Sequence, residues 1–329
     1  MAEARSRDRR LPVMVLGGFL GSGKTTLLKR SFSAPGQPRT AFVINEFGRV
    51  GLDHRVVRET AAAAPAVISG GCVCCDRRPE LVGALREIAD RCDRGQAEVE
   101  RVVLETSGLA DPAPIVAAVA SDPLLRHRFV VDRVTVTLDG VNGRADLAAQ
   151  PEAYRQVAVA DELIITKVDL TTPEEVSALA EAARRLNPAA AISVAAAGAV
   201  EPRPRWPAST RPGAPDGWPA DACTNHDGVA AVCIVREAPL DWVAFSVWLS
   251  MLLHARGDEV LRVKGIVDVD GGGPVAINGV QHVIHAPEHL APDAAGSGTE
   301  LVFITRGIAP GLIERSLDTF DRLAARGRA

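Results

Sequence analysis

A glycine-rich segment near the N-terminus constrains the fold of this chain more than any other feature. Residues 17–26 read Gly-Gly-Phe-Leu-Gly-Ser-Gly-Lys-Thr-Thr, and the run from Gly18 to Thr25 fits the pattern G-x-x-x-x-G-K-[ST]. An apolar strand is predicted before it at residues 11–16, and a helix is predicted from Lys24 to Arg30. A strand, a glycine-rich loop and a helix in this order form a phosphate-binding loop, or P-loop. The loop N–H groups and the positive end of the helix dipole then meet at the bound anion.

The residues of the P-loop have distinct expected roles. Its glycines let the backbone turn N–H groups inward around phosphate oxygens. We expect Lys24 to reach the β- and γ-phosphates and the hydroxyl of Thr25 to bind Mg²⁺. The nucleotide-binding residues predicted in this segment are Gly18, Gly21, Ser22, Gly23, Lys24, Thr25 and Thr26. The alternative is a glycine-rich turn without a ligand, in which the lysine and the hydroxyls would have no purpose.

Strands alternate with helices from residue 11 to residue 198, which predicts an α/β fold with a doubly wound, mostly parallel sheet. After the P-loop strand, further strands are predicted at 40–44, 66–69, 101–104, 130–138, 162–165 and 191–194. Helices are predicted at 79–90, 152–160 and 173–186. Together these segments describe a P-loop nucleoside-triphosphatase domain at 11–198.

Composition changes after this domain. Residues 199–226 are rich in proline and lack periodicity, which predicts an interdomain linker. Residues 227–329 predict a smaller α+β domain with strands at 229–235, 260–269, 275–285 and 301–305 and helices at 241–255 and 311–325. In the first of these helices, apolar residues recur at helical spacing and should face a core: Trp242, Phe245, Leu249, Leu252 and Leu253.

Polar segments follow the predicted strands of the first domain and should meet at the carboxyl edge of its sheet, where ligands bind in open α/β folds. One is 45–53, and another begins with Glu105 and contains Gly108. An acid followed by Ser-Gly after a buried strand is typical of the second magnesium-side element of a phosphate-binding fold. The strand at 130–138 is followed in the same way by Asp139.

The tetrapeptide Thr166-Lys167-Val168-Asp169 resembles the [N/T]-K-x-D base motif of regulatory GTPases. An ionised carboxylate only accepts hydrogen bonds, so Asp169 can take two from the N1–H and amino group of guanine, and adenine has no matching donor pair. The stem of Lys167 would lie over the base. Thr166, in place of the commoner Asn, removes one amide contact. Alone the motif is also compatible with a polar strand end; after a P-loop it favours GTP over ATP.

Three cysteines lie close together in the segment Gly70-Gly71-Cys72-Val73-Cys74-Cys75. Thiolates bind zinc, and three of them leave one coordination position open for water, a carboxylate or a ligand from another protein. A redox pair or buried small residues are the alternatives. Cys92 and Cys233 are expected in the core.

The composition excludes some classes of partner. The net charge of −4 and the pI of about 6.0 argue against a general nucleic-acid or anionic-membrane binder. Residues 1–10 are expected to be a disordered basic tail. No apolar run approaches the length of a membrane span, and the cysteine spacing does not fit a disulfide framework. We therefore expect a cytoplasmic protein with reduced thiols, no nucleic-acid partner and no membrane partner.

Together these motifs resemble one family, the CobW-type GTPases, which are metal chaperones related to the urease- and hydrogenase-maturation GTPases. The resemblance rests on segments 17–26, 45–48, 70–75, 105–112 and 166–169, in this order. In the second domain, Leu261-Arg262-Val263-Lys264-Gly265 and Gly279-Val280-Gln281-His282 resemble the family's C-terminal domain. The likeness extends from residue 11 to about residue 310.

The resemblance implies both a function and a site. GTP would be bound and hydrolysed to GDP with Mg²⁺, and zinc, or cobalt in its place, would be delivered to a client metalloprotein under control of the nucleotide state. A homodimer is compatible with it. The catalytic residues implied are Lys24, Thr25, Glu105 and Gly108, the base-binding residues Thr166, Lys167 and Asp169, and the metal ligands Cys72, Cys74 and Cys75, with Glu46 and, for Mg²⁺, Thr25.

Two departures from the family pattern weaken parts of this hypothesis. Arg49 stands where many relatives have an acid, and no histidine occurs between Asn187 and Asn225, where many relatives carry a histidine-rich run. His282 and His285 are expected on one strand face, as a sheet-face pair more than as metal or client contacts.

Other functions remain open. A phosphotransferase or ATPase using the same P-loop would need an acceptor pocket with a catalytic acid or base. A helper of cobalamin synthesis or of nitrile hydratase would handle cobalt or iron. A passive zinc-binding scaffold would use its nucleotide site only as structure.

Overall fold

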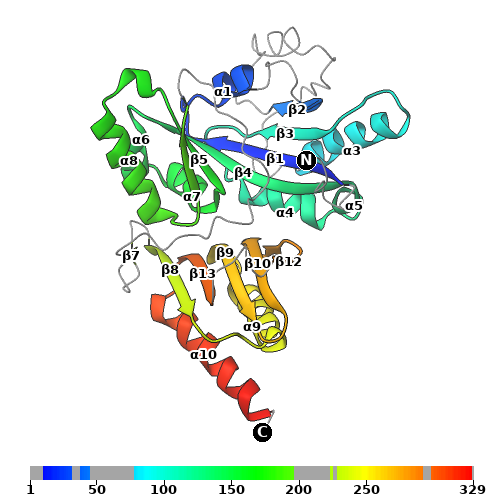
Figure 1. Cartoon of the computed structure of the whole chain (residues 1–329). Helices are drawn as coiled ribbons and strands as arrows, with labels where there is room; N and C mark the ends of the chain where they lie inside the picture. The colour runs from blue at the N-terminus through cyan, green and yellow to red at the C-terminus, as the bar shows by residue number, and fades with distance from the viewer. Residues whose placement is uncertain are drawn as a thin grey trace. The chain divides into compact units, whose positions relative to one another are not determined.

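The computed structural model describes residues 10–31, 38–44, 78–195, 223–224, 228–291 and 298–327. They form two compact units, each built on its own sheet (Figure 1). The prediction of an α/β domain followed by an α+β domain is confirmed. The predicted strand at 66–69 and the tail before residue 10 lie outside the described residues, as do the boundaries at 198 and 226, which stay predictions.

The first sheet has six strands in the order β2-β3-β1-β4-β5-β6. Its strands are β1 (Leu11–Gly18), β2 (Thr40–Ile44), β3 (Arg101–Glu105), β4 (Phe129–Asp139), β5 (Glu162–Thr166) and β6 (Ala191–Val194). The pairings of β2 with β3, β3 with β1, β1 with β4 and β4 with β5 are all parallel. The central strands are apolar runs because a parallel sheet of this kind is buried on both faces.

The helices around this sheet were only partly predicted. They are α1 (Lys24–Ser31), α3 (Arg78–Asp93), α4 (Ala113–Ser121), α5 (Leu125–Arg128), α6 (Gly143–Ala149), α7 (Pro151–Val159), the 3₁₀ turn η1 (Val168–Leu170) and α8 (Pro173–Leu186). The helices α4, α5 and α6 were missed. The reason for α4 is its sequence APIVAAVAS, which is apolar on every side and so carries no helical period.

The second sheet has seven strands, and every pairing recorded between its strands is antiparallel. The elements of this unit are β7 (Cys223–Thr224), β8 (Val229–Arg236), α9 (Trp242–Arg256), β9 (Val260–Val269), β10 (Gly273–Val280), β11 (Val283–Ile284), β12 (Glu288–His289), β13 (Thr299–Arg306) and α10 (Pro310–Gly327).

The predicted apolar face of α9 is confirmed. Phe245, Leu249 and Leu253 are buried in the core of the second unit, with Trp242 and Leu252 packed against it. The indole of Trp248 donates a hydrogen bond to Ser316 Oγ at 2.9 Å and so joins α9 to α10.

The predicted strand at 275–285 is correct as far as Val280, but it does not continue as one strand to residue 285. The strand β10 ends at Val280, and β11 returns antiparallel beside it after a turn at Gln281 and His282. Gln281 has φ of 50°, a left-handed conformation that sequence reasoning assigns to Gly, Asn or Asp, so the turn gave no signal. His282 therefore lies in the turn and not on a strand face with His285. Its ring nitrogens lie 3.2 Å from Leu253 O and 3.0 Å from Asp258 Oδ1.

Two further expectations concern the isolated cysteines and membrane-spanning helices. Cys92 and Cys233 are both only partly buried, which corrects their assignment to the core. None of the helices within the described ranges is long and apolar enough to cross a membrane.

Candidate nucleotide-binding site

Four neighbouring parallel strands, β3, β1, β4 and β5, end at the same edge of the first sheet. Glu105 ends β3, the P-loop follows β1, Asp139 ends β4 and Thr166 ends β5. The register pairs Leu16 with Glu105 and Asp139 with Thr166. Strand order thus brings the P-loop to one edge with Glu105 and the later strand ends, the nearest of which is 80 residues from Thr25 in the sequence.

The P-loop has the backbone conformation that its glycines allow. Gly18, Gly21 and Gly23 have φ values of 142°, 72° and 91°, in the region that favours glycine. A Cβ on Gly18 would lie 2.1 Å from Thr137 Oγ1, so β4 also excludes a side chain there. The hydroxyl of Ser22 is buried and lies 2.7 Å from Thr137 Oγ1. The side chain of Ser22 therefore anchors the P-loop to β4.

Lys24 curls back over the P-loop. Its Nζ donates to the carbonyl oxygens of Gly18 at 2.7 Å and Phe19 at 3.1 Å. Burial lowers the pKa of the Lys24 ammonium, and the charge of Glu105 offsets part of that shift. A cation held this way is poorly solvated and is placed where a phosphate oxygen could replace the carbonyl contacts.

Thr25 meets the acid that ends β3. The Thr25 hydroxyl donates to Glu105 Oε1 at 2.8 Å, and Glu105 is 6% exposed. A hydroxyl and a carboxylate are both oxygen ligands, which Mg²⁺ prefers. The donor set at this position fits a magnesium ion, as the sequence predicts.

The base motif is tied to the P-loop by a contact that sequence reasoning missed. Thr166 Oγ1 lies 2.7 Å from the carbonyl oxygen of Ser22 and 3.1 Å from that of Leu138, and donates toward both. A Cβ on Gly23 would lie 3.4 Å from Thr166 Oγ1. Thr166 thus joins the base motif to the P-loop through the Ser22 carbonyl oxygen.

Lys167 and Asp139 form a second missed pair. Lys167 has φ of 55°, and its Nζ bonds Asp139 Oδ2 at 2.7 Å. Burial raises the pKa of Asp139, but hydrogen bonds from Lys167 and from the backbone N–H groups of Val141 and Asn142 outweigh it and leave the pKa below its ordinary value. Sequence analysis placed Asp139 at this edge but gave it no role. Asp169 and Thr26 are exposed.

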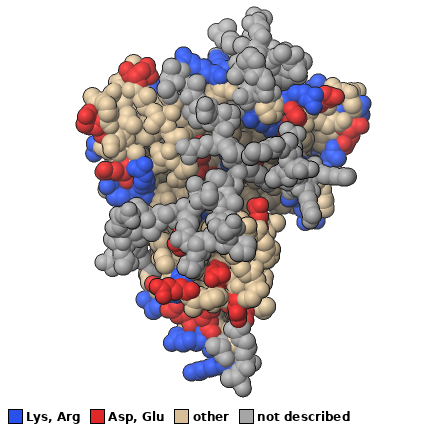
Figure 2. Space-filling view, in the orientation of Figure 1, with Lys and Arg blue, Asp and Glu red and all other residues tan. Residues whose placement is uncertain are grey.

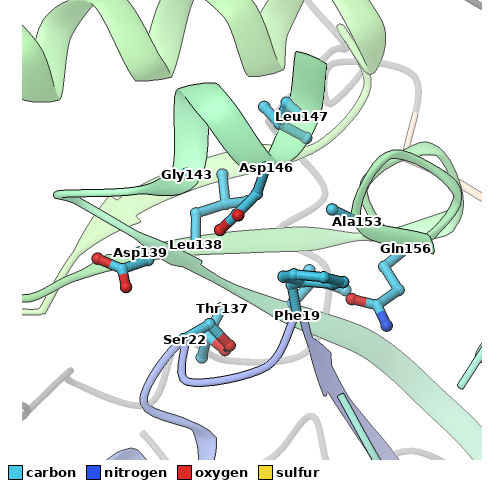
Figure 3. Close-up of a pocket in the computed structure, with 11 residues that line it drawn as sticks. Phe19, Ser22, Thr137, Leu138, Asp139, Gly143, Asp146, Leu147, Ala153 and Gln156 are labelled. Carbon is cyan, nitrogen blue, oxygen red and sulfur yellow. The ribbon is translucent and has the colours of Figure 1, made fainter. Parts of the chain in front are cut away.

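The loop after β3, residues 106–112, packs against the P-loop. A Cβ on Gly108 would lie 2.8 Å from both the N and the Cα of Leu20. From the other side, the amide of Gln156 on α7 donates to the carbonyl oxygens of Gly108 and Ala110. No sequence motif pointed to Gln156. Phe19, Asp146 and Gln156 line a small cavity of about 10 Å³ behind the P-loop together with Ser22, Thr137 and Asp139 (Figure 3).

Family models match both halves of the chain. The nucleotide-binding domain of CobW/HypB/UreG matches residues 12–194, and the cobalamin synthesis protein cobW C-terminal domain matches residues 229–321. The chain belongs to the CobW/HypB/UreG family. The predicted resemblance to CobW-type P-loop GTPases is confirmed.

Relatives of this CobW-family chain include zinc chaperones. The zinc chaperone YjiA of Escherichia coli (strain K12) is 29% identical over 84% of this chain and 88% of its own length. The zinc-regulated GTPase metalloprotein activator 1 of Schizosaccharomyces pombe is 29% identical over 54% of this chain and 44% of its own length. The crystal structure of Zn(II)-bound YjiA GTPase from E. coli has a TM-score of 0.69 and 23% identity, covering 94% of this chain and 99% of that one, and so shares the fold.

The predicted zinc ligands of this CobW-family chain, Cys72, Cys74, Cys75 and Glu46, lie outside the described residues. Within the described ranges, no group of three or more His, Cys, Asp or Glu residues could hold a metal ion. Figure 2 shows acidic and basic side chains interspersed over the described part of the visible face. This pattern does not indicate a basic nucleic-acid surface on that face.

Proposed function

We propose that this chain is a GTP-hydrolysing metallochaperone that binds zinc through Cys72, Cys74 and Cys75 and transfers it to a client metalloprotein under control of the nucleotide state. The observation that carries the nucleotide part is the 2.8 Å contact between Thr25 and Glu105 at the edge shared with Lys24 and Thr166. The metal part is supported by the cysteine spacing and by the names of the relatives, which include zinc chaperones.

Each residue at this edge of the sheet has a separate role in the proposal. In this proposal Lys24 leaves the carbonyls of Gly18 and Phe19 for the β- and γ-phosphate oxygens and neutralises their charge. Thr25 and Glu105 would hold Mg²⁺, which would neutralise charge on the phosphates. In this proposal the backbone N–H of Gly108 would face the γ-phosphate, and Asp169 would accept hydrogen bonds from guanine.

Control by nucleotide follows from the order of segments in the chain. The cysteine segment at 70–75 lies in sequence between residues 45–53 and the loop after β3, both of which follow strands that end at the nucleotide edge. A γ-phosphate can order such segments and hydrolysis can release them. Metal affinity would then depend on which nucleotide is bound, and linkage requires the reverse dependence to be equal.

Zinc binding tests this proposal. We would measure zinc and cobalt affinity of the reduced protein with GDP and with a non-hydrolysable GTP analogue, and compare the wild type with Cys74→Ser. We expect a tight site that needs Cys74 and whose affinity changes about tenfold between nucleotides, about 1.4 kcal/mol of coupling. Equal zinc affinity in both nucleotide states would refute the control of metal binding by the nucleotide. Zinc binding unaffected by Cys74→Ser would refute the proposed cysteine site.

A phosphotransferase using ATP is the second reading. Competition between GTP and ATP for the P-loop separates the two, because Asp169 would select guanine. A passive zinc scaffold predicts no turnover, so GTP hydrolysis abolished by Lys24→Ala would exclude it.

A further inference from the structure

The side chain of Gln156 connects α7 to the loop after β3. Its Nε2 donates to Gly108 O at 3.1 Å and to Ala110 O at 2.9 Å. A primary amide has two N–H donors, so both can be used on one short loop. Gln156 is 0% exposed, which leaves no water to replace either bond. Two carbonyl oxygens of this loop therefore depend on one side chain.

The opposite side of the same loop rests on the P-loop. A Cβ on Gly108 would come within 2.8 Å of the backbone of Leu20, so the two segments are in close backbone contact. The loop also begins with a main-chain bond, from Thr106 N to Leu16 O at 2.9 Å. Gly108 is thus clamped between the P-loop backbone and the Gln156 amide.

The side-chain oxygen of Gln156 takes no part in these hydrogen bonds. Gln156 Oε1 is buried and has no hydrogen-bond partner among the described residues. A buried acceptor without a donor is unfavourable, so an apolar residue of similar size would be the simpler choice if the position only filled space. What an apolar residue lacks is the pair of donors to Gly108 and Ala110.

From this geometry we propose that Gln156 is a positioning residue that sets where the loop after β3 stands relative to the P-loop, and thereby how that loop meets the γ-phosphate. The proposal rests on the proposed GTPase site, since Gly108 is assigned to the γ-phosphate there. In this proposal Gln156 acts through Gly108 and Ala110 and does not itself contact the nucleotide. Substitution of Gln156 should therefore change the binding and turnover of GTP, which carries a γ-phosphate, and should leave the binding of GDP unchanged.

Two substitutions test this role. Gln156→Leu keeps the approximate size and removes both donors. In Gln156→Glu the ionised side chain can only accept hydrogen bonds, whereas the protonated side chain has one O–H donor. Burial beside two carbonyl oxygens should raise the pKa of the new carboxyl. The matched control is Gln150→Glu, the same chemical change at an exposed position between α6 and α7.

We would measure GTP turnover from pH 5.5 to 8.5, and the affinities of a fluorescent GDP and a fluorescent non-hydrolysable GTP analogue. For Gln156→Leu we expect kcat to fall about tenfold, analogue affinity to change at least fivefold, and GDP affinity to stay within twofold. For Gln156→Glu the kcat relative to wild type should rise at least threefold as the pH falls, whereas the ratios for Gln156→Leu and Gln150→Glu should not change with pH.

Three results would overturn the positioning role. One is turnover and analogue affinity of Gln156→Leu within twofold of wild type. Another is an equal loss of GDP and analogue affinity, which is general destabilisation. The third is a Gln156→Glu ratio that does not change with pH. Absence of turnover in the wild type would instead count against the proposed function, and the analogue-to-GDP affinity ratio would still decide the role of Gln156.

Discussion

At the scale of single residues, the Lys167–Asp139 contact shows how an acid at a strand end supports a neighbouring loop. Lys167 lies in a left-handed conformation that a lysine rarely adopts, and its ammonium is fixed by a carboxylate whose side chain is 4% exposed. The same carboxylate accepts N–H bonds from Val141 and Asn142. Asp139 therefore stabilises both its own turn and the base motif one strand away.

Asp139→Asn should lower the free energy of unfolding at pH 7 by about 1–3 kcal/mol, because hydrogen bonds to a charged group are lost. The folded-state pKa of Asp139 is lowered, so its contribution is present above the ordinary aspartate pKa of about 4 and is lost as pH falls through the lower folded value. Urea unfolding of both proteins at pH 7 and below pH 4 checks this. A difference that grows in acid would contradict the assigned sign.

At the scale of elements, the loop after β3 and the P-loop are packed so closely that only glycine fits at the contact. Gly108 has no room for a Cβ, because the atoms it would meet belong to the backbone of Leu20 and cannot rotate away. Backbone cannot adjust as a flexible side chain can, so a methyl group added at Gly108 would push the two loops apart.

Gly108→Ala should therefore reduce GTP turnover strongly and destabilise the protein by about 1–3 kcal/mol, the usual cost of overpacking. Steady-state turnover and urea unfolding measure the two effects. Gly83→Ala is the matched control: Gly83 lies in α3, and its added Cβ would meet nothing within 4 Å. In Gly83→Ala the free energy of unfolding should rise by about 1 kcal/mol, because alanine has a higher helix propensity than glycine. Equal behaviour of the two variants would show that the contact with Leu20 is unimportant.

At the scale of the whole molecule, the two units carry different parts of the chain's chemistry. The P-loop, Glu105 and the base motif all lie on the six-stranded sheet, and the antiparallel sheet supplies none of them. A nucleotide that binds only the folded P-loop unit must stabilise it by mass action.

Saturating GDP with Mg²⁺ should accordingly raise the midpoint of thermal unfolding. At a nucleotide concentration of 100 times Kd the gain is about 2.7 kcal/mol. Far-UV circular dichroism of the wild type and of Lys24→Ala, each with and without nucleotide, makes the measurement. A shift of the same size in Lys24→Ala would mean that the nucleotide does not use the P-loop lysine.

Local pattern was enough for part of this protein. The P-loop was predicted from its glycine–lysine motif. The strand ends at Glu105 and Thr166 and the apolar face of α9 were predicted from the order of apolar and polar residues, because strand and helix periods are properties of neighbouring residues. The same local rules failed where no local signal exists, at the uniformly apolar α4 and at the glycine-free turn of Gln281.

The sequence by itself determined which groups are present and that parallel strands would bring their carboxyl ends to one edge. Only the tertiary structure decided which of those groups meet. Thr25 pairs with Glu105, Thr166 with Ser22 and Lys167 with Asp139, and Gln156 reaches across from α7 to the loop after β3. These partners are between 28 and 144 residues apart, and their contact depends on strand order and register, which the local residue pattern does not encode.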